Sequence, residues 1–144
     1  MAVVHRHALM PYSARTMFDI VNDVAAYPKF LPWCGDAKIS AETDQSMQAS
    51  VLMKKGKLNH WFSTANTMIP GEKIEMKLVD GPFKSLDGVW EFIAFDETTS
   101  KVKLVLNFEF SNGITALLLS PIFTQIANSM VASFCSRAHE LNRL

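Results

Sequence analysis

The sequence predicts an α+β fold, in which a curved, seven-stranded antiparallel sheet wraps around one long C-terminal helix. Segments with alternating apolar and polar residues recur from residue 3 to residue 110, and turns with Gly or Pro separate several of them. This pattern is typical of antiparallel strands that follow one another along the chain. From residue 121 the apolar residues take helical spacing instead. Seven twisted strands curl strongly, so one amphipathic helix fits into their concave face.

The predicted elements follow each other without a linker or repeat, so residues 1–144 are expected to form one domain. Ser13 can cap a helix, and the short apolar pattern after it, which ends at Val24, predicts that helix. The predicted strands cover residues 3–10, 37–41, 47–54, 58–68, a segment from 74 to the break at 80–82, 86–95 and 102–110.

The C-terminal helix is predicted over residues 121–142, roughly 33 Å at 1.5 Å per residue. Proline breaks a helix interior but suits the first helical position, so Ser120 is the predicted N-cap and residues 114–119 form a short turn. No charged residue occurs from 110 to 136, yet a wide polar stripe argues against a membrane span. The stripe expected to face the sheet consists of Phe123, Ile126, Ala127, Met130, Val131, Phe134, Ala138 and Leu141.

An unusually apolar segment joins the first helix to the next strand. It reads YPKFLPWC over residues 27–34. Loops are normally polar because water must solvate their backbone, and the two prolines rule out a regular helix through this segment. The segment therefore forms either the rim of an apolar pocket or a plug for one end of the core.

The charge pattern gives no general case for binding DNA or other nucleic acid, because 14 Lys and Arg balance 14 Asp and Glu. Locally, no acidic residue occurs between Asp44 and Glu72, whereas Lys54, Lys55 and Lys57 lie in that window. A basic hairpin turn is expected there. It either stays solvated, which protects an edge strand from aggregation, or it contacts a partner that carries phosphate.

The expected location is the cytoplasm. Cys34 and Cys135 are far apart and belong to no CxxC pattern, so both are expected to remain thiols in a reducing compartment. The first ten residues lack the apolar core and the cleavage site of a signal peptide.

Six motifs spread over nearly the whole chain combine into a known pattern. They are YPKFLPWC at 27–34, Asn66-Thr67, Ile74-Glu75-Met76, Asp80-Gly81-Pro82-Phe83, Gly88-Val89-Trp90 with Phe92, and Ser120-Pro121 through Gln125-Ile126-Ala127-Asn128. Together they resemble the START and polyketide-cyclase-like superfamily, in the branch that contains coenzyme-Q-binding proteins and the ribosome association toxin RatA. The resemblance implies a helix-grip fold, and the lack of a transit peptide implies the bacterial form. The stretch Asn59-His60-Trp61 is less basic than the family pattern, which weakens an inference to RNA contact there.

Catalysis is not expected. The sequence contains no GxSxG, HExxH or phosphate-binding loop. The strand faces that should point inward are apolar, with His60 and Asn66 as the main polar exceptions and Arg6 as a further candidate. His5 and His7 share a strand face, but two ligands do not make a zinc site. We therefore expect no enzyme, no metal and no required cofactor.

The leading hypothesis is a non-enzymatic protein that binds a hydrophobic ligand. Aromatic rings stack on a flat headgroup and methionines adapt to a flexible tail, so the expected lining suits an isoprenoid quinone such as ubiquinone, or another isoprenoid lipid. The expected role of such binding is to support respiration. About half of the candidate positions are expected in ordinary core packing. The candidates are Phe30, Leu31, Trp33, Phe62, Met76, Phe83, Trp90, Phe92, Phe108, Phe123, Ile126, Met130 and Phe134.

The alternative hypothesis is an interaction protein. The resemblance to RatA implies binding to the large ribosomal subunit and a block of subunit joining, with Lys54, Lys55 and Lys57 as candidate contacts to RNA phosphate. The outer face of the C-terminal helix is polar but uncharged over residues 121–136, so it could dock on a partner or peripherally on the inner membrane.

Overall fold

The computed structural model describes residues 2–111 and 113–142. Its elements follow the predicted order along the chain. They are β1 (Ala2–Met10), α1 (Ala14–Asn22), the 3₁₀ helix η1 (Val24–Lys29), β2 (Cys34–Ser40), β3 (Ser46–Lys55), β4 (Leu58–Ile69), β5 (Lys73–Asp80), β6 (Phe83–Ala94), β7 (Ser100–Phe110) and α2 (Gly113–Leu141).

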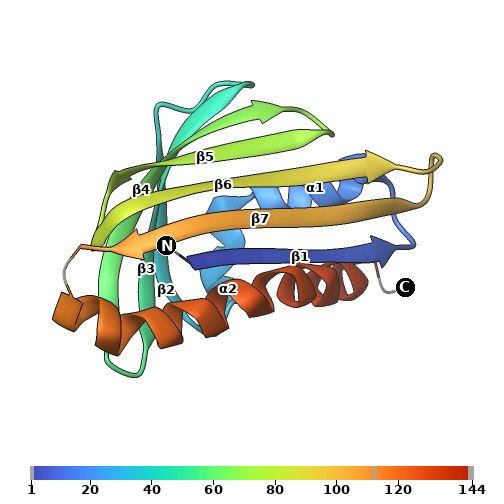
Figure 1. Cartoon of the computed structure of the whole chain (residues 1–144). Helices are drawn as coiled ribbons and strands as arrows, with labels where there is room; N and C mark the ends of the chain where they lie inside the picture. Colours follow the sequence, from blue (N-terminus) through green and yellow to red (C-terminus); the bar gives the residue numbers. More distant parts are fainter. Residues whose placement is uncertain (1, 112, 143–144) are drawn as a thin grey trace.

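The strands form one antiparallel sheet of seven in the order β1-β7-β6-β5-β4-β3-β2. All consecutive strands from β2 to β7 are neighbours, and β1 adds to the free side of β7. The sheet curves around α2, which runs along its open side, while α1 and η1 cover one end of the concave face (Figure 1). The predicted α+β architecture is confirmed.

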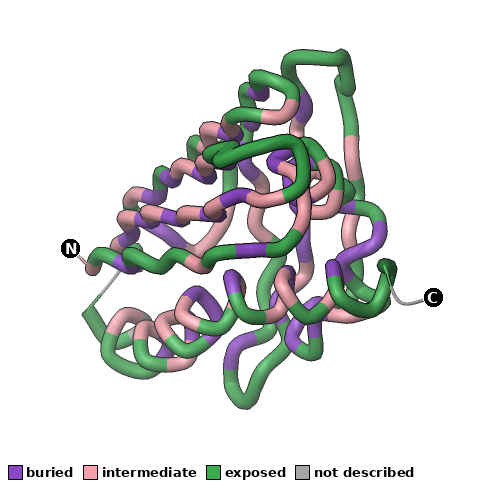
Figure 2. The backbone as a smooth tube through the Cα atoms, turned by 90° about the vertical axis from the view of Figure 1, so that its right-hand side faces the viewer, coloured by how far each residue is buried: buried purple, intermediate pink, exposed green. Residues whose placement is uncertain are grey.

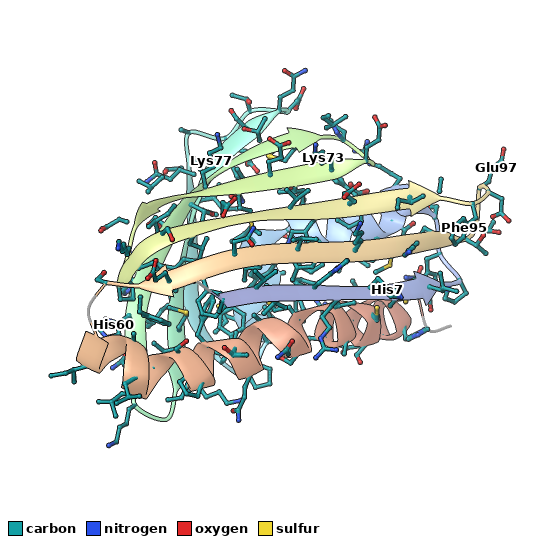
Figure 3. All side chains as sticks on the ribbon, in the orientation of Figure 1. His7, His60, Lys73, Lys77, Phe95 and Glu97 are labelled. Atoms are coloured by element: carbon teal, nitrogen blue, oxygen red, sulfur yellow. The ribbon has the colours of Figure 1, made fainter. Side chains whose placement is uncertain are left out.

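Alternation places one face of each strand in the core. In β7 every second residue is buried, from Val102 through Leu104 and Leu106 to Phe110, and the residues between them are half-buried. The same alternation is visible along the strands in Figure 2. Lys73 and Lys77 of β5 lie on the opposite, outer face of the sheet (Figure 3). Because the side-chain period of a strand is two, this pattern also fixes the register.

Helix α1 begins where the sequence predicts. The side-chain oxygen of Ser13 accepts a hydrogen bond from the backbone N–H of Thr16, which satisfies one of the free donors of the first turn. Met17, Phe18 and Val21 on its inner side are buried in the core. The helix therefore closes the concave face at the end opposite the start of α2.

One expectation about proline holds and one is wrong. Pro28 lies inside the 3₁₀ helix η1, but η1 ends at Lys29, so no regular helix runs through the segment 27–34. Helix α2 begins at Gly113, Pro121 lies inside it, and Ser120 is not its N-cap. Proline removes one backbone donor, but the turns before it stay packed because Leu119 is buried against the sheet.

The inward stripe of α2 is confirmed from Phe123 to Ala138, with Met130 half-buried, but Leu141 is exposed. By length and composition alone, Ala116–Leu141 is apolar enough to cross a membrane. Its buried side chains face the sheet, and a core helix passes the same test of composition.

Candidate functional site

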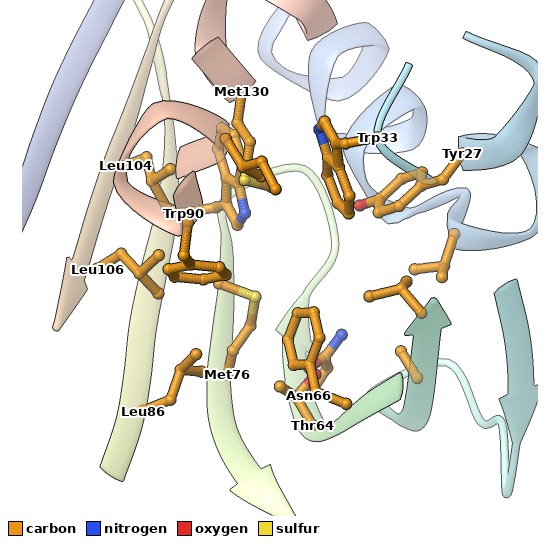
Figure 4. Close-up of a pocket in the computed structure, with 16 residues that line it drawn as sticks. Tyr27, Trp33, Thr64, Asn66, Met76, Leu86, Trp90, Leu104, Leu106 and Met130 are labelled. Carbon is orange, nitrogen blue, oxygen red and sulfur yellow. The ribbon is translucent and has the colours of Figure 1, made fainter. Parts of the chain in front are cut away.

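A cavity lies between the middle of the sheet and α2. The empty space between its walls, counting the mouth, is about 660 Å³, yet only about 60 Å³ admits the centre of a water molecule. That is room for a few waters and less than a typical ligand pocket offers. Its lining comes from η1, the following loop, five strands and α2: Val24, Tyr27, Trp33, Ala49, Val51, Phe62, Thr64, Asn66, Met76, Leu86, Trp90, Leu104, Leu106, Phe123, Ile126 and Met130 (Figure 4).

The cavity exists because several inward positions carry small side chains. Ala49 and Val51 of β3 face inward where other strands present large residues. Gly88 of β6 contributes no side chain at all, and a Cβ added there would lie 2.8 Å from Leu106 Cδ1 and 2.9 Å from Met76 Cε. Met76 and Leu106 thus occupy part of the space that Gly88 leaves.

The polar groups of the lining are few and uncharged. The Thr64 hydroxyl donates a hydrogen bond of 2.7 Å to the Asn66 side-chain oxygen, and both residues are buried. The Tyr27 hydroxyl donates to the backbone oxygen of Val21. Burial raises the pKa of Tyr27 far above its usual range, so this hydroxyl stays protonated. No lining residue carries a charge, so the site suits neutral, mostly apolar molecules.

The structure brings seven of the predicted site residues together around the cavity. They are Trp33, Phe62, Met76, Trp90, Phe123, Ile126 and Met130. Met76, Met130 and Phe62 are only half-buried, and the thioether side chains are adaptable. Tyr27 and Trp33 line the cavity, so the apolar segment at 27–34 forms part of its wall.

The other six predicted residues lie outside the lining because they pack against neighbours. Phe83 and Phe108 belong to the phenylalanine cluster, defined here as Phe83, Phe108, Phe110 and Phe123. Phe92 packs edge-on against Phe18 of α1. Phe134 contacts Tyr27, Phe30 and Trp90, and Leu31 is buried.

Phe30 was predicted to line the ligand site, but it does not contact the cavity. Its half-buried ring sits under the guanidinium of Arg137, 4.9 Å from the ring centroid, on the outer side of the η1–α2 contact. Of the polar residues expected to point inward, Asn66 does so, whereas His60 and Arg6 are exposed.

Several lining residues were not among the predicted site residues. They are Val24, Tyr27, Ala49, Val51, Thr64, Asn66, Leu86, Leu104 and Leu106. The strand alternation places most of them on the inward face. The sequence feature that could have identified them is side-chain volume, because small inward residues opposite large ones indicate unfilled space.

The basic turn predicted between two strands is present. Lys54, Lys55 and Lys57 are exposed at the β3–β4 turn, where Gly56 has a positive φ of 58°. A shallow surface groove beside the turn is lined by Lys57, His60, Pro82, Ser111, Ile114, Leu118 and Leu119. Figure 3 shows His60 at this end of the molecule, next to the start of α2.

The same end also exposes aliphatic side chains of the first turns of α2. Ile114 is 76% exposed and Leu117 is 77% exposed. The end of the molecule thus combines three lysines with an apolar helix surface. Within residues 2–111 and 113–142, no group of three or more His, Cys, Asp or Glu could hold a metal ion.

The sequence matches the family described as polyketide cyclase / dehydrase and lipid transport over residues 10–135. The chain belongs to this family. Solved structures agree with the helix-grip fold of the family. The Zhui aromatase/cyclase from a Streptomyces species has a TM-score of 0.86 at 11% identity, over 99% of this chain and 96% of that one. A START superfamily protein from Mycobacterium smegmatis has a TM-score of 0.77 at 19% identity, over 97% and 99%.

The chain is also similar to curated proteins. The ribosome association toxin RatA of Pseudomonas aeruginosa is 46% identical over 138 residues, which cover 96% of each chain. The mitochondrial coenzyme Q-binding protein COQ10 homolog B of Xenopus laevis is 25% identical, over 90% of this chain and 55% of that protein. Neither name denotes an enzyme, whereas the structural neighbours include a cyclase.

Proposed function

We propose that this chain is a ribosome-associating protein of the RatA type, with the large ribosomal subunit as its partner. The observation that carries the proposal is the 46% identity to a ribosome association toxin along 96% of both chains. Binding that blocks subunit joining is the expected activity. Binding of a hydrophobic ligand is the second candidate function.

The exposed lysines of the β3–β4 turn are the proposed contact. RNA phosphates release bound cations when lysines neutralise them, so affinity falls as salt rises. Three lysines support only a shallow salt dependence unless protein contacts add to them. The exposed Ile114 and Leu117 beside the turn could supply such apolar contacts.

Sedimentation of ribosomal subunits tests this proposal. Wild type should co-sediment with the large subunit at low salt, and changing Lys54, Lys55 and Lys57 to Glu should reduce binding strongly. The matched control changes Lys73, Lys77 and Lys103, on the outer face of the sheet, to Glu. Equal loss in both variants would indicate general charge repulsion rather than a contact at the turn.

Two further outcomes would redirect the proposal. If the turn variant binds normally while changing Gln125 and Asn128 to Lys abolishes binding, the contact lies on the uncharged face of α2. If wild type does not bind at low salt, the ribosome proposal fails and ligand binding remains. In that case, flotation with vesicles of anionic lipid would test peripheral attachment to the inner membrane.

A second candidate function is non-enzymatic binding of an apolar ligand, with an isoprenoid quinone as the favoured molecule. The uncharged cavity with Trp33, Trp90 and two methionines favours it. No acid–base pair or nucleophile–base pair occurs in the lining, which supports a carrier rather than a catalyst. A cytoplasmic protein that contacts the membrane peripherally could load such a ligand.

Binding requires the cavity to open further, because the present space of about 60 Å³ is too small for a quinone ring. The half-buried Met76 and Met130 are the side chains best placed to move. Native mass spectrometry of the purified protein, with extraction of retained lipids, tests the proposal. Failure to retain or take up quinones of several tail lengths would refute it.

A further inference from the structure

The side-chain amide nitrogen of Asn66 faces the cavity without a hydrogen-bond partner among the described residues. Asn66 lies on β4 and is 6% exposed. Its side-chain oxygen accepts the hydrogen bond from Thr64, which orients the amide so that the nitrogen points the other way. Figure 4 shows this nitrogen directed into the cavity, towards Tyr27 and Trp33 on the opposite wall. No hydrogen-bond acceptor for it is found among the described residues.

Two hydroxyls of the lining are already engaged: those of Thr64 and Tyr27 donate to Asn66 and to Val21. The indole nitrogen of Trp33 lacks a partner, but neighbouring atoms enclose it completely. The indole N–H of Trp90 also lines the cavity, and no partner for it is found among the described residues. The Asn66 amide and the Trp90 indole are therefore the donors that the cavity offers to a bound molecule, and the amide is the one that Thr64 holds in a fixed orientation.

We infer that the Asn66 amide donates a hydrogen bond to an oxygen acceptor on a neutral, otherwise apolar ligand. A carbonyl or ether oxygen would satisfy the donor, which otherwise stays unpaired when water leaves the cavity. A carboxylate or phosphate would bring a charge into a lining without any counter-charge, which is strongly unfavourable.

The inference rests on the proposed ligand binding and specifies its chemistry. Ring stacking on Trp33 and Trp90 selects a flat molecule, and Asn66 selects one that carries an acceptor. A site built to hydrogen-bond its ligand discriminates strongly against an analogue that lacks the matching group. The cavity should therefore prefer a ketone or quinone over a hydrocarbon of the same shape.

Two small probes test this preference. Duroquinone and durene share a six-membered ring with four methyl groups, and only duroquinone has carbonyl oxygens. Titration of the wild type, followed by protein NMR, should give about fivefold to tenfold tighter binding of duroquinone. Asn66→Leu should remove this preference while durene binding persists. The matched control Asn59→Leu changes an exposed residue of the same strand and should keep the preference.

A spectroscopic readout does not depend on any variant. The side-chain amide resonances of Asn66 should shift on binding of duroquinone and much less on binding of durene. If both probes bind equally and these resonances do not respond, the role of Asn66 is overturned while ligand binding stands. If neither probe binds to the wild type, the proposed ligand binding itself fails.

Discussion

The concave face of the sheet holds two regions that share the same alternation of apolar and polar residues. One region is filled by side chains, and the other leaves a cavity. At the start of α2 the phenylalanine cluster is solid: the ring centroid of Phe123 lies 4.7 Å from that of Phe108, 5.0 Å from Phe83 and 5.9 Å from Phe110. Towards the middle of the sheet the wall carries Ala49 and Gly88, and a cavity remains.

Alternation of apolar and polar residues is equally regular in both regions. What differs is the volume of the inward side chains, which decides whether the space between the sheet and α2 is filled. Phe123 belongs to both regions, since it joins the cluster and lines the cavity. Substitutions that change side-chain volume should therefore cost much stability in the cluster and little at the cavity.

The largest effect is expected for Phe123→Ala in the cluster. Removing this ring takes one ring contact away from each of four neighbouring phenylalanines and leaves a cavity between them, so the free energy of unfolding should fall by about 3–5 kcal/mol. Urea unfolding measures it. Phe95→Ala, at an exposed ring, is the matched control and should change stability by less than about 0.5 kcal/mol. A loss below about 1 kcal/mol for Phe123→Ala would mean that the cluster is not tightly packed.

A smaller effect is expected for Met130→Trp at the cavity. The larger indole can occupy empty space, so stability should change by less than about 1 kcal/mol while binding of duroquinone is lost. Val131→Trp, at the next, buried position of the same helix, should cost about 1–3 kcal/mol or more through overpacking. Equal losses in the two variants, measured by thermal unfolding, would show that the region around Met130 is solid.

Gly88→Ala adds a single methyl group beside the cavity, and Gly81→Ala adds one at a tightly packed turn. The added Cβ would displace the ends of Met76 and Leu106, which can shift towards the cavity, so the net change should stay within about 1 kcal/mol. At Gly81, φ is 147° and the Cβ would lie 2.7 Å from Phe62 Cβ, so Gly81→Ala should cost about 1–3 kcal/mol more. Denaturant midpoints of the two variants give the comparison, and the reverse order would contradict it.

The smallest effect at neutral pH concerns Cys34, at the end of the cavity wall. Burial raises the pKa of its thiol to about 11, from the ordinary 9.0. Well below pH 9 the thiol is protonated in both states, so stability does not depend on it. As pH rises from about 9 to 11, only the unfolded chain loses the proton, so stability should fall. Cys34→Ala should flatten this part of the stability profile, and native Cys34 should react slowly with iodoacetamide at pH 8.

The sequence predicts the strands well because each has one buried face, and a slip by one residue would turn every apolar side chain outward. It fails at Pro121, where local propensity favours a helix start. There the burial of Leu119 keeps the preceding turns helical, and no local pattern reports that contact.

The site is predictable only in part, for a related reason. Inward aromatic residues such as Phe62 and Phe108 look alike in the sequence, yet one lines the cavity and the other packs within the cluster. Which of them meets another ring depends on pairing across strands and on the rotation of α2. The small residues Ala49 and Val51, which create the space, have no chemistry that marks them as part of a site.

The open side of the sheet has a mechanical consequence. Between the edge strands β1 and β2 the enclosure is completed by α2, and within residues 2–111 and 113–142 no backbone hydrogen bond joins α2 to a strand. Side chains make the connections, such as Arg6 to Asn128 at 2.9 Å and Tyr12 to His139 at 2.7 Å. The attachment of α2 to the sheet therefore depends on side-chain packing and side-chain hydrogen bonds, and a displacement of α2 from β1 would break none of the backbone hydrogen bonds of the sheet.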